Sequence, residues 1–250
     1  MCATCGCGND EPTHDHPHPH PHGKVPRISL RPPRRTVLLE QDVLAKNDRL
    51  AVDNRRWLAE RKILALNVMS SPGSGKTTLL EQTIARVGAE LDIAVIEGDQ
   101  ATPNDAERIR AAGAAAHQIN TGTGCHLDAS MLARGLEALA PRPGSLLIIE
   151  NVGNLVCPAL FDLGERAKVV VVSCTEGEDK PLKYPHMFRA GDVLVLNKID
   201  LLPYVKFDVA RFLDNAQRVN PKLRVFQLSA TRGDGLDAWC DWLRGERAAC

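Results

Sequence analysis

The amino-acid sequence predicts an α/β fold, in which helices cover both faces of a mostly parallel β-sheet. From residue 63 to residue 228, short apolar runs alternate with segments of helical spacing. Strands that are buried on both faces of a parallel sheet have this continuous apolar character. The chain has 250 residues, of which 44% are hydrophobic and 25% charged, and this is enough for one sizeable core. We therefore expect one globular domain with an appended segment.

The appended segment is the first 35 residues, in which proline, histidine, glycine and arginine predominate. A segment with so few large apolar side chains cannot bury enough surface to offset the entropy of ordering it. We expect residues 1–35 to form a flexible, disordered arm that binds metal, and residues 36–250 to form the globular domain. The candidate ligands of the arm are Cys2, Cys5, Cys7, His14, His16, His18, His20 and His22.

The arm offers two kinds of metal ligand. If Met1 is removed, the three thiolates and the α-amino group of Cys2 provide the square-planar coordination that Ni²⁺ accepts better than Zn²⁺ does. A thioredoxin-like redox role is disfavoured, because no strand precedes the cysteines. The alternating histidines are expected to bind several divalent ions weakly, and the alternative for them is a solvated spacer.

Charge and composition limit the classes of partner and the cellular compartment that we expect. The formal net charge is zero, so neither nucleic acid nor an acidic membrane is a favoured partner. We find no secretory signal pattern and no apolar run that approaches the length of a membrane span. We expect a cytoplasmic protein, in which thiols stay reduced and clustered cysteines indicate metal rather than disulfides.

The elements of the globular domain follow from its apolar spacing. Between residues 36 and 62 the spacing predicts an amphipathic helix, interrupted near Asn47, that packs on the following domain. Seven apolar runs then predict strands at residues 63–68, 93–96, 114–119, 146–149, 169–172, 193–196 and 224–228. Ligands of open α/β sheets bind at the carboxyl ends of the strands, so the residues that follow these runs are the candidate site residues.

The first predicted strand runs into a glycine-rich loop and then into a helix. The loop fits the P-loop pattern of glycine, four residues and Gly-Lys-Thr, except that Ser70 replaces the first glycine. Lys76 is expected to reach the β- and γ-phosphates of a nucleotide, and the Thr77 hydroxyl to bind Mg²⁺. The strand before the loop and the helix after it disfavour a turn that binds nothing. The residues expected to contact phosphate are Gly73, Ser74, Gly75, Lys76, Thr77 and Thr78.

The sixth predicted strand ends in a motif that selects guanine. Asn197, Lys198 and Asp200 form the Asn-Lys-x-Asp pattern of GTPases. The Asp200 carboxylate can accept both the N1–H and the exocyclic amine of guanine, and adenine has no such pair of donors. After the last strand, Ser229 and Ala230 can add a backbone N–H to the guanine O6. The sequence therefore favours GTP over ATP, because such a site rejects a base that leaves its polar groups unpaired.

Two further strands end in carboxylates at the same edge. Asp99 closes the second strand, and Glu150 stands near the end of the fourth, three residues before Gly153. Either carboxylate can hold Mg²⁺ through water, and Gly153 can sense the γ-phosphate. The alternative is that these residues only cap the strand ends.

Cys125, His126 and Cys157 are candidate metal ligands within the globular domain. Free cysteines are often small buried hydrophobic residues, and this alternative stays open. Cys157, however, follows the proposed γ-phosphate sensor closely, so a metal ligand there would move when the nucleotide changes. From the motif positions alone, a nucleotide-linked metal site and a pair of core cysteines are equally supported.

Taken together, these motifs resemble the HypB-type nickel-inserting GTPases of nickel–iron hydrogenase maturation, which are SIMIBI-class P-loop proteins. The resemblance covers nearly the whole chain and includes the cysteine-rich start and the histidine-rich arm. Its other parts are the P-loop and the segments 97–100, 120–129, 150–158, 175–180 and 197–200.

The resemblance implies a metallochaperone that hydrolyses GTP to GDP and inserts nickel into the hydrogenase large-subunit precursor. No obvious glutamine positions the attacking water, so intrinsic hydrolysis is expected to be slow. The resemblance also implies a homodimer favoured by GTP, and a small Ni/Zn-binding accessory protein as a partner. A high-affinity nickel site would lie at the N-terminal cysteines, and a second site for Ni²⁺ or Zn²⁺ at Cys125, His126 and Cys157, near the dimer interface. Lys183 is the candidate for a lysine that contacts the phosphates of the partner subunit.

Two alternatives remain. The protein can be a nickel storage or buffering protein in which the histidine arm is the working part. It can also be a nickel GTPase for urease, which would share the P-loop and a Cys-x-His pair. The adjacent Cys125 and His126, the separate Cys157 and the cysteine-rich start favour hydrogenase.

Overall fold

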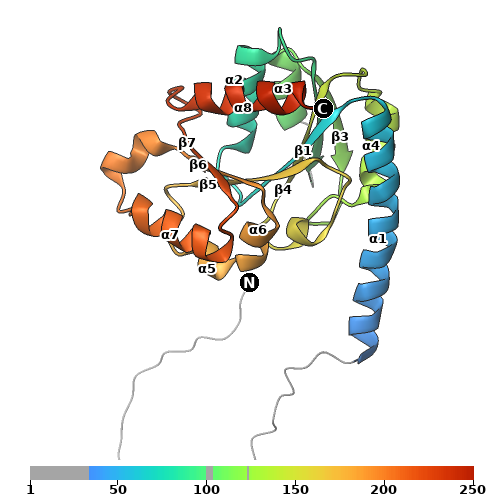
Figure 1. Cartoon of the computed structure of the whole chain (residues 1–250), viewed down its shortest axis with the longest axis horizontal. Coiled ribbons are helices and arrows are strands. Elements are labelled where there is room, and N and C mark those ends of the chain that lie inside the picture. The colour runs from blue at the N-terminus through green and yellow to red at the C-terminus, as the bar shows by residue number, and fades with distance from the viewer. Residues whose placement is uncertain (1–33, 100–103, 123) are drawn as a thin grey trace, which may run out of the picture.

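The computed structural model describes residues 34–99, 104–122 and 124–250 (Figure 1). Its centre is a seven-stranded sheet of order β3-β2-β4-β1-β5-β6-β7, in which every neighbouring pair is parallel. The strands are β1 (Leu64–Ser70), β2 (Ile93–Asp99), β3 (Ala115–Asn120), β4 (Leu146–Gly153), β5 (Ala167–Ser173), β6 (Val193–Asn197) and β7 (Arg224–Gln227). All seven predicted strands and the α/β class are confirmed.

Helices cover both faces of this sheet (Figure 1). The α-helices are α1 (Arg34–Glu60), α2 (Lys76–Val87), α3 (Asn104–Ala111), α4 (Ala129–Leu139), α5 (Lys180–Lys183), α6 (Pro185–Ala190), α7 (Val209–Val219) and α8 (Leu236–Ala248), with 3₁₀ turns η1 (Cys157–Leu160) and η2 (Ile199–Tyr204). None of the helices in the described ranges has the length and apolar character needed to cross a membrane. Most of the arm expected at residues 1–35 lies outside the described ranges, and α1 begins within it at Arg34.

The two faces of the sheet carry separate hydrophobic cores, because successive side chains of a strand point to opposite faces. On one face, Leu66 and its neighbours pack with α2, α3 and α8, including the buried Trp239. On the other, Ala65 packs with α1 and α4, and Val170 packs with α6 and α7. All seven residues of β1 are buried, which explains why most of them are apolar. The strand is the fourth of seven, so the loop that follows it lies at the middle of one sheet edge.

Helix α1 is continuous, so the predicted interruption near Asn47 is wrong. Asn47 is buried, where its Nδ2 donates to the carbonyl of Asp162 at 2.8 Å and its Oδ1 accepts from the N–H of Ala129 at 2.9 Å. Two turns later, Asn54 Nδ2 donates to the carbonyl oxygens of Ala129 at 2.8 Å and Leu163 at 3.1 Å. These asparagines bind neighbouring segments instead of competing for the backbone of their own helix, and they fix α1 to the start of α4.

We expect Asn54→Ala to lower the free energy of unfolding by about 1–3 kcal/mol, because buried carbonyl oxygens lose their donor. Urea denaturation followed by circular dichroism measures the change. Val52→Ala is the control, since Val52 is half exposed on the same helix and an exposed substitution should change stability by less than about 0.5 kcal/mol. Equal effects of the two substitutions would show that the Asn54 hydrogen bonds add nothing to stability.

Candidate nucleotide and metal site

The P-loop lies between β1 and α2 and depends on glycine at two positions. Gly73 has a φ of +74° and Gly75 a φ of +94°, in the left-handed region that favours glycine. A Cβ at Gly75 would also lie 2.6 Å from Nδ2 of Asn197. The loop therefore approaches the guanine motif more closely than any other residue type would allow.

Lys76 begins α2 and turns back toward the start of the loop. Its Nζ donates to Oγ of Ser70 at 2.8 Å, and Ser70 Oγ in turn donates to the carbonyl of Ser71 at 2.6 Å. Burial lowers the pKa of Lys76, and the negative charge of Glu150 acts in the opposite direction. Ser70, which departs from the P-loop pattern, thus gives the ammonium group a partner that a glycine side chain could not supply.

Thr77 and Glu150 meet directly. Thr77 Oγ1 donates to Oε1 of Glu150 at 2.8 Å, and both residues are buried. Burial raises the pKa of Glu150, while the charge of Lys76 and the Thr77 hydrogen bond lower it. Oε2 of Glu150 is buried and has no partner among the described residues. A hydroxyl and an orphaned carboxylate oxygen beside a P-loop fit Mg²⁺, which prefers oxygen ligands.

Glu97 is a buried carboxylate beside the expected phosphate site that sequence reasoning missed. It lies in β2 directly opposite Glu150 in the parallel register, whereas the predicted Asp99 lies two residues further, at the half-buried end of the strand. Burial raises the pKa of Glu97 to about 8, the charge of Glu150 adds to the rise, and a backbone hydrogen bond with Ala106 opposes it. A glutamate inside an otherwise apolar strand was the signal that could have identified it.

The guanine motif is tied to the P-loop. Asn197 is buried at the end of β6, where its Nδ2 donates to the carbonyl of Ser74 at 2.9 Å and its Oδ1 accepts from the N–H of Ala230 at 3.0 Å. Lys198 adopts a φ of +61°, and its Nζ donates to the carbonyl of Gly73 at 2.7 Å. The two polar residues therefore fix the loop that would hold phosphate relative to the motif that would hold the base.

Asp200 and Ser229 complete the base side of the site. Oγ of the buried Ser229 donates to Oδ1 of Asp200 at 2.6 Å. The structure thus brings together all five residues that the sequence assigns to guanine, although they come from the ends of β6 and β7.

Gly153 lies against the P-loop. A Cβ at Gly153 would be 3.2 Å from the backbone N and Cα of Pro72. The glycine expected to sense the γ-phosphate is therefore in contact with the loop that would surround the phosphates. Thr78 occupies the first turn of α2, where its Oγ1 lies 3.4 Å from Nη2 of Arg108.

The three internal metal candidates come together beside this region. One ligand atom from each of Cys125, His126 and Cys157 lies within 4.8 Å of the others, and all three residues are half-buried. The His126 ring stacks on Phe161 with centroids 4.0 Å apart. Burial lowers the pKa of His126, and the hydrogen bond with Cys125 raises the pKa of Cys157. A neutral imidazole and two thiols suit a late transition metal, provided that metal binding displaces the thiol protons.

The loop after β3 crosses the end of β2 to reach this cluster. A Cβ at Gly98 in β2 would lie 2.7 Å from Cγ of Leu127, so only glycine permits the crossing. Leu127 directly follows Cys125 and His126 in the sequence. The crossing therefore carries these two ligands from the β3 side of the sheet to Cys157, which follows β4.

Two asparagines connect the end of β4 to the same loop. Oδ1 of the buried Asn151 accepts from the N–H of Leu127 at 3.0 Å, and its Nδ2 donates to Oδ1 of Asn67 at 3.2 Å. Asn154 Nδ2 lies 3.4 Å from the carbonyl oxygen of Cys125. The segment that carries Glu150 and Gly153 is thus hydrogen-bonded to the loop that carries the metal candidates.

Of the predicted site residues not yet placed, Lys183 belongs to the part of the chain that the structure describes. Lys183 in α5 has 62% of its side chain exposed, and its Nζ lies 2.6 Å from Oδ2 of Asp179. Cys2, Cys5 and Cys7 lie outside the described residues.

Glu176 is a second contact of the P-loop that sequence reasoning missed, because Ser71, its partner in the loop, is distant in the chain. Its carboxylate accepts from the hydroxyl of Ser71 in the P-loop and from the N–H of Ser173, and it also lies 3.4 Å from Nζ of Lys180.

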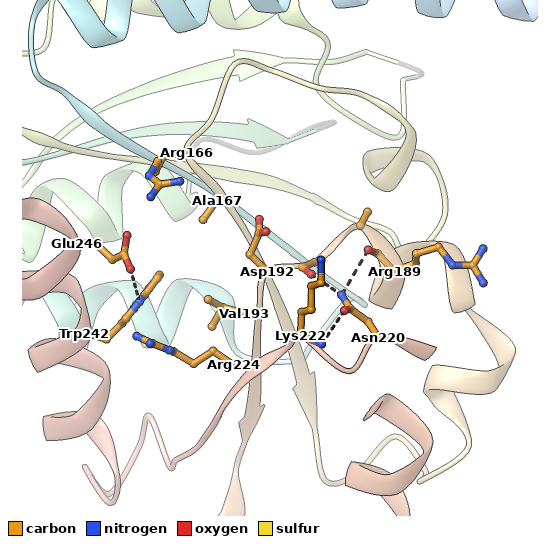
Figure 2. Close-up of a pocket in the computed structure, with 12 residues that line it drawn as sticks. Arg166, Ala167, Arg189, Asp192, Val193, Asn220, Lys222, Arg224, Trp242 and Glu246 are labelled. Carbon is orange, nitrogen blue, oxygen red and sulfur yellow. Dashed lines mark hydrogen bonds between the residues drawn. The ribbon is translucent and has the colours of Figure 1, made fainter. Parts of the chain in front are cut away.

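A separate cavity of about 400 Å³ opens at the opposite edge of the sheet, where β5 and β6 begin (Figure 2). Charged side chains of both signs line it, among them Arg166, Asp192 and Glu246. Glu246 accepts from the indole N–H of Trp242 at 3.0 Å. None of the described residues predicted to bind nucleotide or metal lines this cavity, so we place the candidate functional site at the carboxyl edge of the strands.

Comparison with known proteins shows which family the chain resembles. The family model described as the CobW/HypB/UreG nucleotide-binding domain matches residues 64–227. The hydrogenase maturation factor HypB of Escherichia coli (strain K12) is 57% identical over 216 residues, which cover 86% of this chain and 74% of that protein.

Two solved structures have the same P-loop fold. HypB from Archaeoglobus fulgidus is 44% identical with a TM-score of 0.76, covering 81% of this chain and 99% of that one. HypB from Helicobacter pylori, solved in complex with nickel, is 38% identical with a TM-score of 0.77, covering 82% and 96%. The chain therefore belongs to the CobW/HypB/UreG family, and within that family to the HypB-type hydrogenase maturation factors.

Proposed function

We propose that this protein is a GTP-hydrolysing metallochaperone that binds Ni²⁺ and promotes its insertion into the large-subunit precursor of a nickel–iron hydrogenase. One observation carries the proposal. Residues 150–157 contain a carboxylate bonded to Thr77, a glycine against Pro72 and the thiol of Cys157 in the metal cluster. A single short segment thus links the expected phosphate site to the expected metal site.

In this proposal, the chain positions GTP through groups that are already held in place. Lys76 is held by Ser70 at the start of the loop, and Asn197 and Lys198 fix the carbonyl groups of the loop from the base side. Thr77 and Glu150 would hold Mg²⁺, which neutralises charge on the phosphate oxygens when bound. Hydrolysis without a partner protein is expected to be slow, as in other switch GTPases.

The metal cluster would act as the part that responds to the nucleotide. Asn151 and Asn154 bond the end of β4 to the loop of Cys125, so a displacement of Gly153 would be transmitted to the ligands. We assign Ni²⁺ to this cluster as cargo, with Zn²⁺ as a competing occupant. The N-terminal cysteines and histidines would capture nickel and supply it to the cluster.

The proposal extends to assembly and location. It includes a homodimer favoured by GTP, in which Lys183 contacts the phosphates of the partner subunit, and complexes with a small Ni/Zn accessory protein and with the precursor. The Lys183 side chain is largely exposed, which is compatible with such a contact. The cytoplasm is the proposed compartment, because Cys125 and Cys157 have to remain reduced to bind metal.

GTP can drive metal transfer only if Ni²⁺ binds the two nucleotide states unequally. We expect the Ni²⁺ affinity of the internal cluster to differ by about 5- to 150-fold between the GDP complex and the complex with a non-hydrolysable GTP analogue. The measurement uses the full chain with Cys2, Cys5 and Cys7 changed to serine, so that sulfur-to-nickel charge-transfer absorption reports the internal thiolates. The matching adenine nucleotides serve as the control. Equal Ni²⁺ affinities in the two guanine complexes would show that nucleotide and metal are not coupled.

A further inference from the structure

Two buried carboxylate oxygens at the carboxyl edge of the sheet lack a hydrogen-bond partner among the described residues. They are Oε2 of Glu97, in a residue that is 2% exposed, and Oε2 of Glu150, in a residue that is 4% exposed. Buried polar atoms in native proteins are almost always paired, so two orphaned oxygens in one place point to a missing ligand.

The register of the sheet sets the two carboxylates side by side. Strands β2 and β4 are neighbours, and Glu97 pairs with Glu150 in the parallel ladder. Paired residues of parallel strands point to the same face, so both side chains lie on one side of the sheet. Thr77, at the start of α2, donates its hydroxyl to Glu150 on that side.

The cationic side chains nearby do not balance this pair. The half-buried Lys76 attracts both carboxylates electrostatically, but its hydrogen bond goes to Ser70. Arg108 in α3 is bonded to Glu81 and Asp105. Two carboxylates in a buried setting repel each other unless a further positive charge lies between them or near both.

We propose that Glu97 is a second carboxylate of the magnesium site, which together with Glu150 holds the Mg²⁺ that Thr77 and the nucleotide phosphates bind. This inference rests on the proposed nucleotide-binding function and adds a residue to it. Mg²⁺ is held in nucleotide sites by one or two carboxylates and the substrate phosphates, and the donors on the chain fit this set. In the alternative, Glu97 is an uncharged structural residue that the cation does not need.

The two explanations predict different behaviour of Glu97→Gln, which keeps the shape of the side chain and removes its charge. We expect the Mg²⁺ concentration that half-saturates tight binding of a fluorescent GDP analogue to rise by at least about tenfold. The affinity for the same nucleotide in EDTA should stay the same or increase, because a negative charge near the phosphates is removed. A loss of fold would weaken binding under both conditions.

Glu165→Gln is the matched control, since Glu165 is also a buried carboxylate but bonds Asn67 and the N–H of Leu163 instead. It should leave the Mg²⁺ dependence unchanged. If Glu97→Gln does not fold, Glu97→Asp replaces it, with an expected rise of at least about threefold. The proposal would be overturned if the folded variant needed the same Mg²⁺ concentration as the wild type to half-saturate tight binding of the GDP analogue. Failure of the unaltered protein to bind guanine nucleotide would instead overturn the proposed function.

Discussion

Replacing Asp200 with asparagine is expected to lower the affinity for GTP by at least about 100-fold and to create binding of xanthosine triphosphate. The Asp200 carboxylate can accept two hydrogen bonds, from N1–H and the exocyclic amine of guanine. The asparagine side chain ends in one carbonyl oxygen, which accepts hydrogen bonds, and one NH₂ group, which donates them. Xanthine has a carbonyl where guanine has the amine, so the asparagine side chain complements xanthine and leaves a mismatch with guanine.

The structure indicates that this substitution will leave the phosphate side of the site intact. Asn197 and Lys198, not Asp200, bond the carbonyl groups of the P-loop. Ser229 can keep its hydrogen bond to the remaining side-chain oxygen at position 200. The loss should therefore be confined to recognition of the base.

Equilibrium competition of GTP and xanthosine triphosphate against a fluorescent nucleotide measures both affinities. Asp214→Asn is the control, because Asp214 is an exposed aspartate on α7 whose removal should affect neither nucleotide. An unchanged GTP affinity in Asp200→Asn would mean that this carboxylate does not recognise the base. An equal loss of both nucleotides would mean that the substitution damages the site as a whole.

The sequence could predict every strand and most of the candidate nucleotide site, because these features are local. Each strand contains a short run that is mostly apolar or lies among apolar residues, and the motifs of Lys76 and of Asn197 are contiguous in the chain, at the end of a strand or immediately after it. The carboxyl ends of parallel strands meet at one edge, so a topological rule was enough to bring the two motifs together.

Features that depend on partners distant in the sequence were predicted incorrectly or not at all. Asn47 was interpreted as an interruption, because its partners Asp162 and Ala129 are visible only after folding. Glu97 was passed over for Asp99, since the importance of Glu97 comes from the register that sets it opposite Glu150. Hydrophobic spacing carries no information about which strand is the neighbour of another.

The metal cluster lies between these two cases. The sequence could propose Cys125, His126 and Cys157 as ligands, but it left buried core cysteines equally supported. Strands β3 and β4 are not neighbours, so the two cysteines meet only because the β3 loop crosses β2 at Gly98. The half-buried cluster contrasts with Cys174, which is buried and donates to the carbonyl of Lys198.

Cys157→Ser is expected to lower the Ni²⁺ affinity of the internal cluster by at least about 100-fold, because it removes a ligand itself and not a residue that only supports one. The hydroxyl of serine is a harder and much less acidic ligand than a thiol, so it is a poor substitute for binding Ni²⁺. The sulfur-to-nickel absorption of the full chain with serine at positions 2, 5 and 7 measures the loss.

Cys250→Ser is the control, because Cys250 is an exposed cysteine outside the cluster and its removal should leave Ni²⁺ binding unchanged. GTP binding should survive in Cys157→Ser, since the Lys76–Ser70 and Thr77–Glu150 hydrogen bonds do not involve Cys157. Retained Ni²⁺ affinity would place the metal elsewhere and remove the link to the nucleotide, because only Cys157 among the three candidates shares a short segment with Glu150 and Gly153. Loss of Ni²⁺ with intact GTP binding would locate the cargo at a cluster whose Cys157 follows Glu150 and Gly153 by only a few residues.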